Sequence, residues 1–144
     1  MVNDDTIELL RECNAGVKMG VTSISRVMPH VKKGELKSSL NKCKDEHAEL
    51  GDRTHKMLLD YKAETKEPHM IARAMSDMKI RGKLMMSSNE HTVADLMTDG
   101  CNMGVKSLNK YLNQYKAADE VSKDIAKRLI HLEEKLTTDV RGYL

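Results

Sequence analysis

Polar side chains with metal-binding or hydrogen-bonding chemistry interrupt four apolar repeats of this sequence. They are Asn14, His47, Cys101 and Glu133, and each takes a position where the surrounding spacing predicts an apolar side chain. Imidazole, carboxylate and thiolate groups are the ligands that zinc and iron take in proteins. His47, Glu133, Cys101 and the nearby Cys13 therefore form a candidate metal site for iron or zinc.

The same residues have a second interpretation that needs no metal. A His47–Glu133 pair with asparagine neighbours can satisfy its own hydrogen bonds inside a helical core and fix which helices pair. A metal site would require three ligands to converge on one point, which is the more demanding arrangement. We therefore prefer the hydrogen-bonded layer and keep the metal site as the alternative.

Each of these residues belongs to a segment whose apolar positions are spaced alternately by three and four, which is typical of one helix face. This spacing predicts four long helices and a shorter one between them, at about residues 4–31, 35–63, 68–86, 88–116 and 119–143. Helix-start signals support these boundaries. Segments 5–8 and 87–90 match the capping-box pattern, and Asp119 is a candidate cap for the last helix.

Four helices of similar length predict an all-α, antiparallel four-helix bundle, with residues 1–144 in a single domain. Short loops join the first two and the last two long helices, whereas the middle connection is long and contains the extra connector helix. We expect this connection to let the third long helix start at the same end as the first, parallel to it and diagonal across the bundle. Counting from the two hairpin turns places Asn14, His47, Glu133 and the pair Cys101-Asn102 near the middle.

An internal repeat relates the two halves of the chain. The segment Cys13–Lys18 reappears as Cys101–Lys106, with five of six positions identical. Together with the connector helix and the Glu133-Glu134 pair, this repeat resembles the ferritin-like superfamily, and more narrowly its small uncharacterised bacterial members. The resemblance implies two helical hairpins joined by a long crossover. In the metal-binding members it also implies Glu-x-x-His on two of the helices.

The chain departs from that metal-binding pattern. Glu-x-x-His does not occur in the sequence, which has Glu46-x-x-Glu49 and the reversed His131-x-x-Glu134 instead. A ferroxidase or iron-storage role is therefore not expected. A bound metal would have to occupy a non-standard site.

Composition excludes several classes of function. The net charge is +2, so the strong positive field of nucleic-acid-binding proteins is missing. The chain has no Phe and no Trp, so only four tyrosines could stack on bases, which almost excludes that kind of binding. No apolar run reaches the roughly 20 residues of a membrane helix, and the acidic start lacks the features of a signal peptide. We therefore expect a cytoplasmic protein without nucleic-acid or membrane partners.

The three cysteines, Cys13, Cys43 and Cys101, lack the C-x-x-C spacing of zinc knuckles, and their odd number does not indicate a disulfide framework. They lie at or beside core positions, where a free thiol usually acts as a small apolar side chain. We expect Cys43 in particular to be inert. A cysteine nucleophile, and with it an enzyme, is therefore not predicted.

Methionine is abundant, with 11 residues in the chain. Methionines can fill the core in place of aromatic side chains, which is the interpretation we prefer. In the connector helix they could instead form an adaptable surface for a partner or a second subunit, from Met70, Met75, Met78, Met85 and Met86.

The sequence therefore predicts a non-enzymatic helical bundle of uncharacterised role, without a resident cofactor. It would act through self-association, as a homodimer, or through a protein partner that docks on the connector helix. The alternative is a metal-binding protein with iron or zinc at the mid-bundle site.

Overall fold

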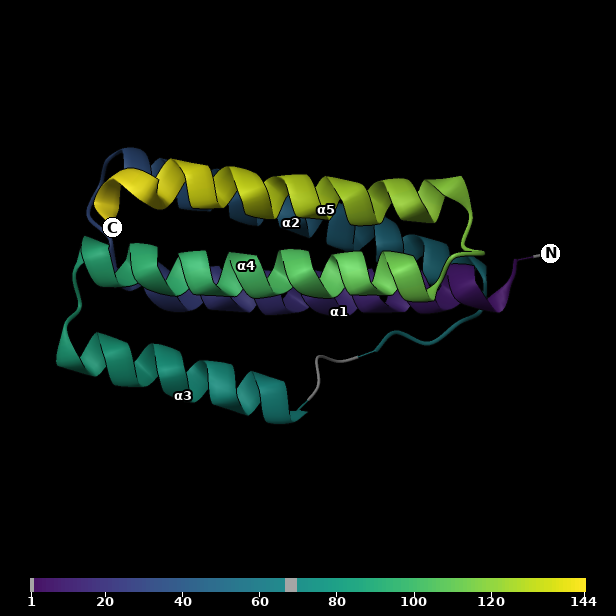
Figure 1. Ribbon diagram of the computed structural model, residues 1–144, viewed down its shortest axis with the longest axis horizontal. Helices are drawn as coiled ribbons and strands as arrows, with labels where there is room; N and C mark the ends of the chain where they lie inside the picture. The colour runs from purple at the N-terminus through teal and green to yellow at the C-terminus, as the bar shows by residue number, and fades with distance from the viewer. Residues whose placement is uncertain (1, 67–69) are drawn as a thin grey trace.

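The computed structural model describes residues 2–66 and 70–144, and it describes the side chains of these residues except 70–77. Within this part the chain is helical, as predicted (Figure 1). The helices are α1 (Asp4–Val27), α2 (Glu35–Asp60), α3 (Met70–Met86), α4 (Glu90–Gln114) and α5 (Glu120–Val140), with short 3-10 helices at Met28–His30 and Arg141–Tyr143. The boundaries agree with the predicted ones to within a few residues, and positions 68–69 of the predicted connector helix lie outside the described residues.

Three helices begin at a side chain that accepts a hydrogen bond from the backbone N–H three residues later. These side chains are Asn3, Asn89 and Asp119. The prediction for Asp119 is confirmed, whereas the capping boxes predicted at 5–8 and 87–90 are wrong. Asn is as good a helix cap as Asp or Ser, and in both cases an Asn lies where the helix actually begins.

The turn between α1 and α2 explains why α1 ends before residue 31. Pro29 has no backbone N–H, and the chain around it forms the 3-10 helix Met28–His30 instead of another α-helical turn. Gly34 then precedes α2 with a φ of +148°, a conformation that side-chain-bearing residues rarely adopt. The loop is therefore set by one proline and one glycine.

The four long helices lie side by side, and α3 lies outside them (Figure 1). The pairs α1–α2 and α4–α5 form hairpins, α2 packs beside α5, and α1 packs beside α4. Asn3 Nδ2 donates to the Ala117 carbonyl at 2.8 Å, and the Asp119 N–H donates to Thr6 Oγ1 at 2.8 Å. The start of α1 thus lies beside the end of α4.

The predicted direction of the third long helix is therefore wrong. Helix α4 is antiparallel to α1 and adjacent to it, not parallel and diagonal. The reason is that α3 runs back along the length of the bundle, so that α4 starts at the end where α1 finishes (Figure 1).

The apolar core consists of two clusters of buried side chains that follow one another along the bundle. One cluster includes Ile24, Leu40, Cys43 and Leu136, and the other includes Leu10, Val17, Leu50 and Leu129. Among the described helices, none has the length and apolar character needed to cross a membrane.

Candidate functional site

A buried histidine and a partly buried glutamate form a pair between the two apolar clusters. His47 on α2 is only 1% exposed, and its Nε2 lies 3.1 Å from Oε1 of Glu133 on α5. Its other ring nitrogen, Nδ1, lies 2.8 Å from the backbone carbonyl of Cys43, one turn earlier on α2. Both ring nitrogens therefore have an acceptor.

Two glycines on the other helices make room for this pair. A Cβ atom added to Gly20 of α1 would lie 3.0 Å from Cδ2 of His47, and one added to Gly104 of α4 would lie 3.3 Å from Cδ of Glu133. Small residues let helices approach closely. Here they give space to the imidazole and the carboxylate, so all four long helices contribute to the site.

The geometry favours a positively charged imidazolium at His47. A neutral ring carries one N–H, whereas here a carbonyl oxygen and a carboxylate oxygen each require a donor. Burial alone would lower the pKa of His47. Hydrogen bonds and charge from Cys43 and Glu133 outweigh burial and raise the pKa of His47 from 6.5 to about 10. The site therefore pairs a buried imidazolium with the partly buried side chain of Glu133 at neutral pH.

Two of the three cysteines belong to this site. Cys43 Sγ lies 3.5 Å from Nδ1 of His47. Burial, followed by the charge of Glu133 and a hydrogen bond to it, raises the pKa of the Cys101 thiol. Cys13 does not belong here. It is buried in the other apolar cluster, where burial and the neighbouring Glu12 raise its pKa to about 12.

The predicted mid-bundle layer therefore divides into two. Asn14 belongs to a separate polar contact between α1 and α2, where its side-chain nitrogen donates to the Gly51 carbonyl at 3.2 Å and to Thr54 Oγ1 at 3.0 Å. In the sequence, Thr54 takes an apolar position of the alternating repeat, as His47 does. Its position could therefore have indicated this second polar contact. Asn102 is exposed and takes part in neither group.

The residues that converge on His47 do not fit a metal in this arrangement. A metal-binding histidine needs one ring nitrogen with a free lone pair, and here both nitrogens donate hydrogen bonds. In the described part of the chain, no three His, Cys, Asp or Glu side chains are placed to hold a metal ion. The site at His47, Glu133, Cys101 and Cys13 stays a prediction, and it would now require His47 to release a hydrogen bond.

Comparisons with known proteins bear on the fold alone. No family model matches the chain, and no curated protein matches it. Among solved structures, the chain is similar to a DUF305 fragment from Deinococcus radiodurans, with a TM-score of 0.76 over 98% of this chain and 95% of that chain. The two sequences are 11% identical, so this likeness supports a shared all-helical fold and nothing about function.

Proposed function

We propose that this chain is a ferritin-like four-helix bundle that acts without catalysis, by pairing with a second copy of itself through α3. In this proposal the His47–Glu133 pair is an internal element of the bundle. Two helical hairpins joined by a crossover that contains α3 support the ferritin-like assignment. The exposed side of α3 supports the homodimer.

The described side chains of α3 attach it to the bundle by two lysine–aspartate pairs and by apolar contacts. Lys79 Nζ lies 2.8 Å from Asp99 Oδ2, and Lys83 forms a hydrogen bond with Asp95, so two lysines of α3 pair with two aspartates of α4. Ile80 of α3 is buried in the core cluster, and Leu84 packs against that cluster partly buried. This attachment uses one side of α3 and leaves the rest of its described surface to solvent.

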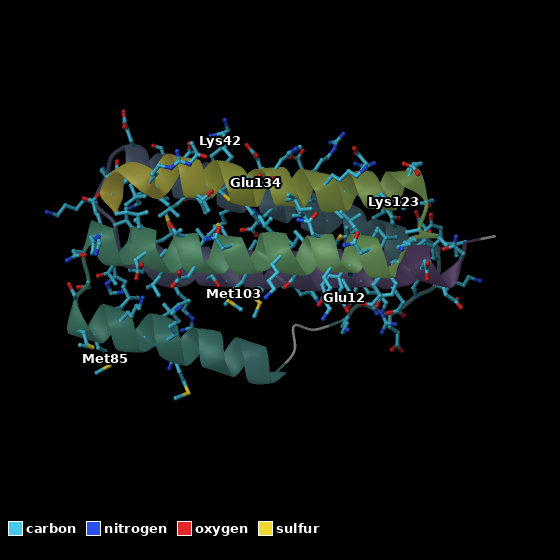
Figure 2. All side chains as sticks on the ribbon, in the orientation of Figure 1. Glu12, Lys42, Met85, Met103, Lys123 and Glu134 are labelled. Atoms are coloured by element: carbon cyan, nitrogen blue, oxygen red, sulfur yellow. The ribbon has the colours of Figure 1, made fainter. Side chains whose placement is uncertain are left out.

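The observation that carries the proposal is the exposure of three methionines on α3. Met78, Met85 and Met86 are 74%, 88% and 89% exposed, the largest exposures among the large apolar side chains that the structure describes. Met85 projects from the outer side of α3, away from α4 (Figure 2). Flexible methionine side chains adapt well to an apolar partner surface. A second α3 offers such a surface and also satisfies the two-fold symmetry of a homodimer.

Sedimentation velocity over a concentration series tests the proposal. At high concentration we expect the sedimenting species of the wild type to have about twice the 16.3 kDa mass of one chain. The double variant Met85→Lys/Met86→Lys should remain monomeric, because four charges would meet across the two-fold axis. Both side chains are exposed, so the substitutions leave the fold of the monomer intact.

The control is Leu59→Lys, which adds a lysine at a 61% exposed leucine on α2. It should dimerise as the wild type does. A wild type that stays monomeric throughout the series would contradict the proposal. Equal loss of dimer in the control and the double variant would contradict the assignment of the interface to α3.

A further inference from the structure

Helix α3 is fastened to α4 by two ion pairs that share one register. Lys79 Nζ lies 2.8 Å from Asp99 Oδ2, and Lys83 forms a hydrogen bond with Asp95. The two lysines are four residues apart on α3, and the two aspartates are four residues apart on α4, so each set lies on one face of its helix. The later lysine meets the earlier aspartate. The two helices are therefore antiparallel, and both pairs form together in this one alignment.

The apolar part of this attachment is narrow. Ile80 is buried in one of the two core clusters, and Leu84 packs against the same cluster. These two residues are also four apart, so they form a single stripe beside the two lysines. Met78, Met85 and Met86 remain exposed. Among the described side chains of α3, the docked face is therefore a strip two residues wide.

The four long helices pack largely without α3, which lies outside them (Figure 1). The core cluster that includes Leu10, Val17 and Leu129 contains no described side chain of α3. To the other cluster, the described side chains of α3 add one buried residue, Ile80. The loss of α3 from this face would therefore leave most of the bundle core in place.

Helix α3 has little helical stability of its own. It spans the 17 residues Met70–Met86, and an isolated helix of roughly this length is marginal in water because its first turn is costly to form. Gly82 lies inside α3, and a glycine in a helix interior loses more backbone freedom on folding than other residues do. Detachment of α3 from α4 would therefore also unfold it.

The ion pairs that hold α3 are open to solvent. The side chains of Lys79, Lys83, Asp95 and Asp99 are 38–48% exposed. The Debye length falls from about 10 Å at 0.1 M salt to about 3 Å at 1 M, so dissolved salt weakens such pairs. The apolar contacts between the long helices carry no charge for salt to screen. Salt should therefore act mainly on the attachment of α3.

We propose that α3 is a salt-sensitive switch element, which detaches from α4 and unfolds while the four-helix bundle stays folded. Detachment brings Ile80 and Leu84 into solvent and frees Asp95 and Asp99 on the surface of α4. Local opening of a weakly attached segment, without global unfolding, is common in proteins. The switch is a property of the single chain and is independent of the proposed homodimer.

Hydrogen–deuterium exchange with peptide mass spectrometry tests the switch, at a protein concentration at which the chain is monomeric. We expect the amides of residues 78–86 to exchange at least about fivefold faster in about 1 M than in about 0.05 M sodium chloride. The amides of the long helices should keep their rates. Equal exchange of residues 78–86 at both salt concentrations would overturn the proposal, and so would an equal acceleration in the long helices.

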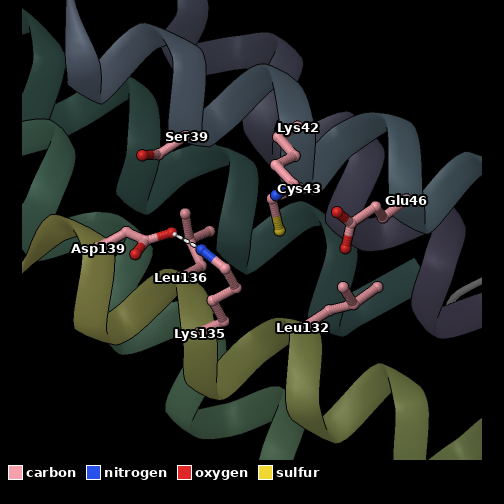
Figure 3. A pocket seen from close by; sticks show the side chains of 8 residues that line it. All are labelled: Ser39, Lys42, Cys43, Glu46, Leu132, Lys135, Leu136 and Asp139. Atoms are coloured by element: carbon pink, nitrogen blue, oxygen red, sulfur yellow. Dashed lines mark hydrogen bonds and ion pairs between the residues drawn. The ribbon is translucent and has the colours of Figure 1, made fainter.

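Two double variants separate these ion pairs from a general effect of charge. Asp95→Asn/Asp99→Asn should speed exchange at residues 78–86 by about tenfold in low salt and remove most of its salt dependence. The control Asp124→Asn/Asp139→Asn changes the net charge equally and removes two ion pairs inside α5, one of them the contact between Lys135 and Asp139 (Figure 3). Its α3 should exchange as in the wild type. Equal exchange of α3 in the two variants would refute the role of Asp95 and Asp99.

Gly82→Ala should shift the switch in the opposite direction. An added Cβ meets no described atom within 4 Å, so alanine fits at this position. Because alanine favours the helix over the unfolded segment, exchange at residues 78–86 should slow by about fivefold, while the long helices keep their rates. Slowing throughout the chain would mean that α3 opens only together with the bundle, which contradicts the proposal.

Discussion

Replacing His47 by glutamine tests whether the buried ring carries a positive charge in the folded protein. Glutamine keeps a side-chain N–H that can donate to Glu133, but it has no proton to lose near neutral pH. The wild type and the variant therefore differ in one titrating group. The pH dependence of the difference between their stabilities reports the charge of that group.

The magnitude follows from the pKa of His47, which is about 10 in the folded chain against an ordinary value of 6.5. Because the folded pKa is the higher one, the stabilisation is complete below pH 6.5 and is lost as the pH rises through about 10. Within this window the folded chain holds about one more proton than the unfolded chain, and the free energy of unfolding falls by about 1.4 kcal/mol per pH unit. Between pH 7 and pH 9 the loss is about 2.5 kcal/mol, since unfolded His47 is still partly protonated at pH 7.

Urea unfolding followed by far-ultraviolet circular dichroism measures both proteins at pH 6, 7, 8 and 9. The wild type should lose its advantage over His47→Gln by about 2.5 kcal/mol between pH 7 and pH 9. Titration of Cys13 affects both proteins equally and cancels in the difference. The same difference at all four pH values would refute the reasoning, because His47 would then be neutral in the folded chain. If His47→Gln does not fold, Glu133→Gln is the second variant and should show a flatter pH dependence than the wild type.

Two further predictions concern the space around His47 and its lone pairs. Gly16→Ala should stabilise the protein by up to about 1 kcal/mol, because an added Cβ meets no described atom within 4 Å. Gly20→Ala should be the less stable of the two variants, because its Cβ would press on the His47 ring. The reverse order of stability in urea unfolding would contradict this packing. Elemental analysis of protein purified without an affinity tag should find no stoichiometric iron, zinc or manganese, because both His47 nitrogens donate hydrogen bonds. Stoichiometric metal that disappears in His47→Ala would overturn the assignment of a buried ion pair and restore the metal hypothesis.

The helix faces could be predicted from the sequence because the alternating spacing of three and four is long and unbroken. That spacing places His47 and Glu133 on inward faces, and the structure confirms both positions. The levels of residues along the axis were harder to predict. Asn14 lies six residues before Gly20, the residue of α1 that faces His47, and six helical residues span about 9 Å. Counting through a turn that contains Pro29 cannot resolve such a difference.

The direction of α4 and the charge of His47 could not be predicted from the sequence, for two different reasons. A long connection can bring the next helix back to either end, and only the packing of α3 along the bundle decides which. The charge of His47 depends on which atom faces each ring nitrogen, and that is a matter of side-chain rotation. Periodicity indicates which side of a helix a residue occupies, but it does not indicate how the imidazole ring is turned.

A buried ion pair adds little to the stability of a fold, because the free energy lost in desolvating the two charges nearly equals the free energy gained from their attraction. The presence of His47 and Glu133 between two apolar clusters therefore needs a further reason. One reason is register, since the pair fixes how α2 lies against α5. The second ring N–H faces the Cys43 carbonyl at 2.8 Å, which fixes the orientation of the ring. Because α2 itself orients the ring in this way, Nε2 is held facing Glu133 at 3.1 Å, and the contact between the two side chains can set the register of α2 against α5.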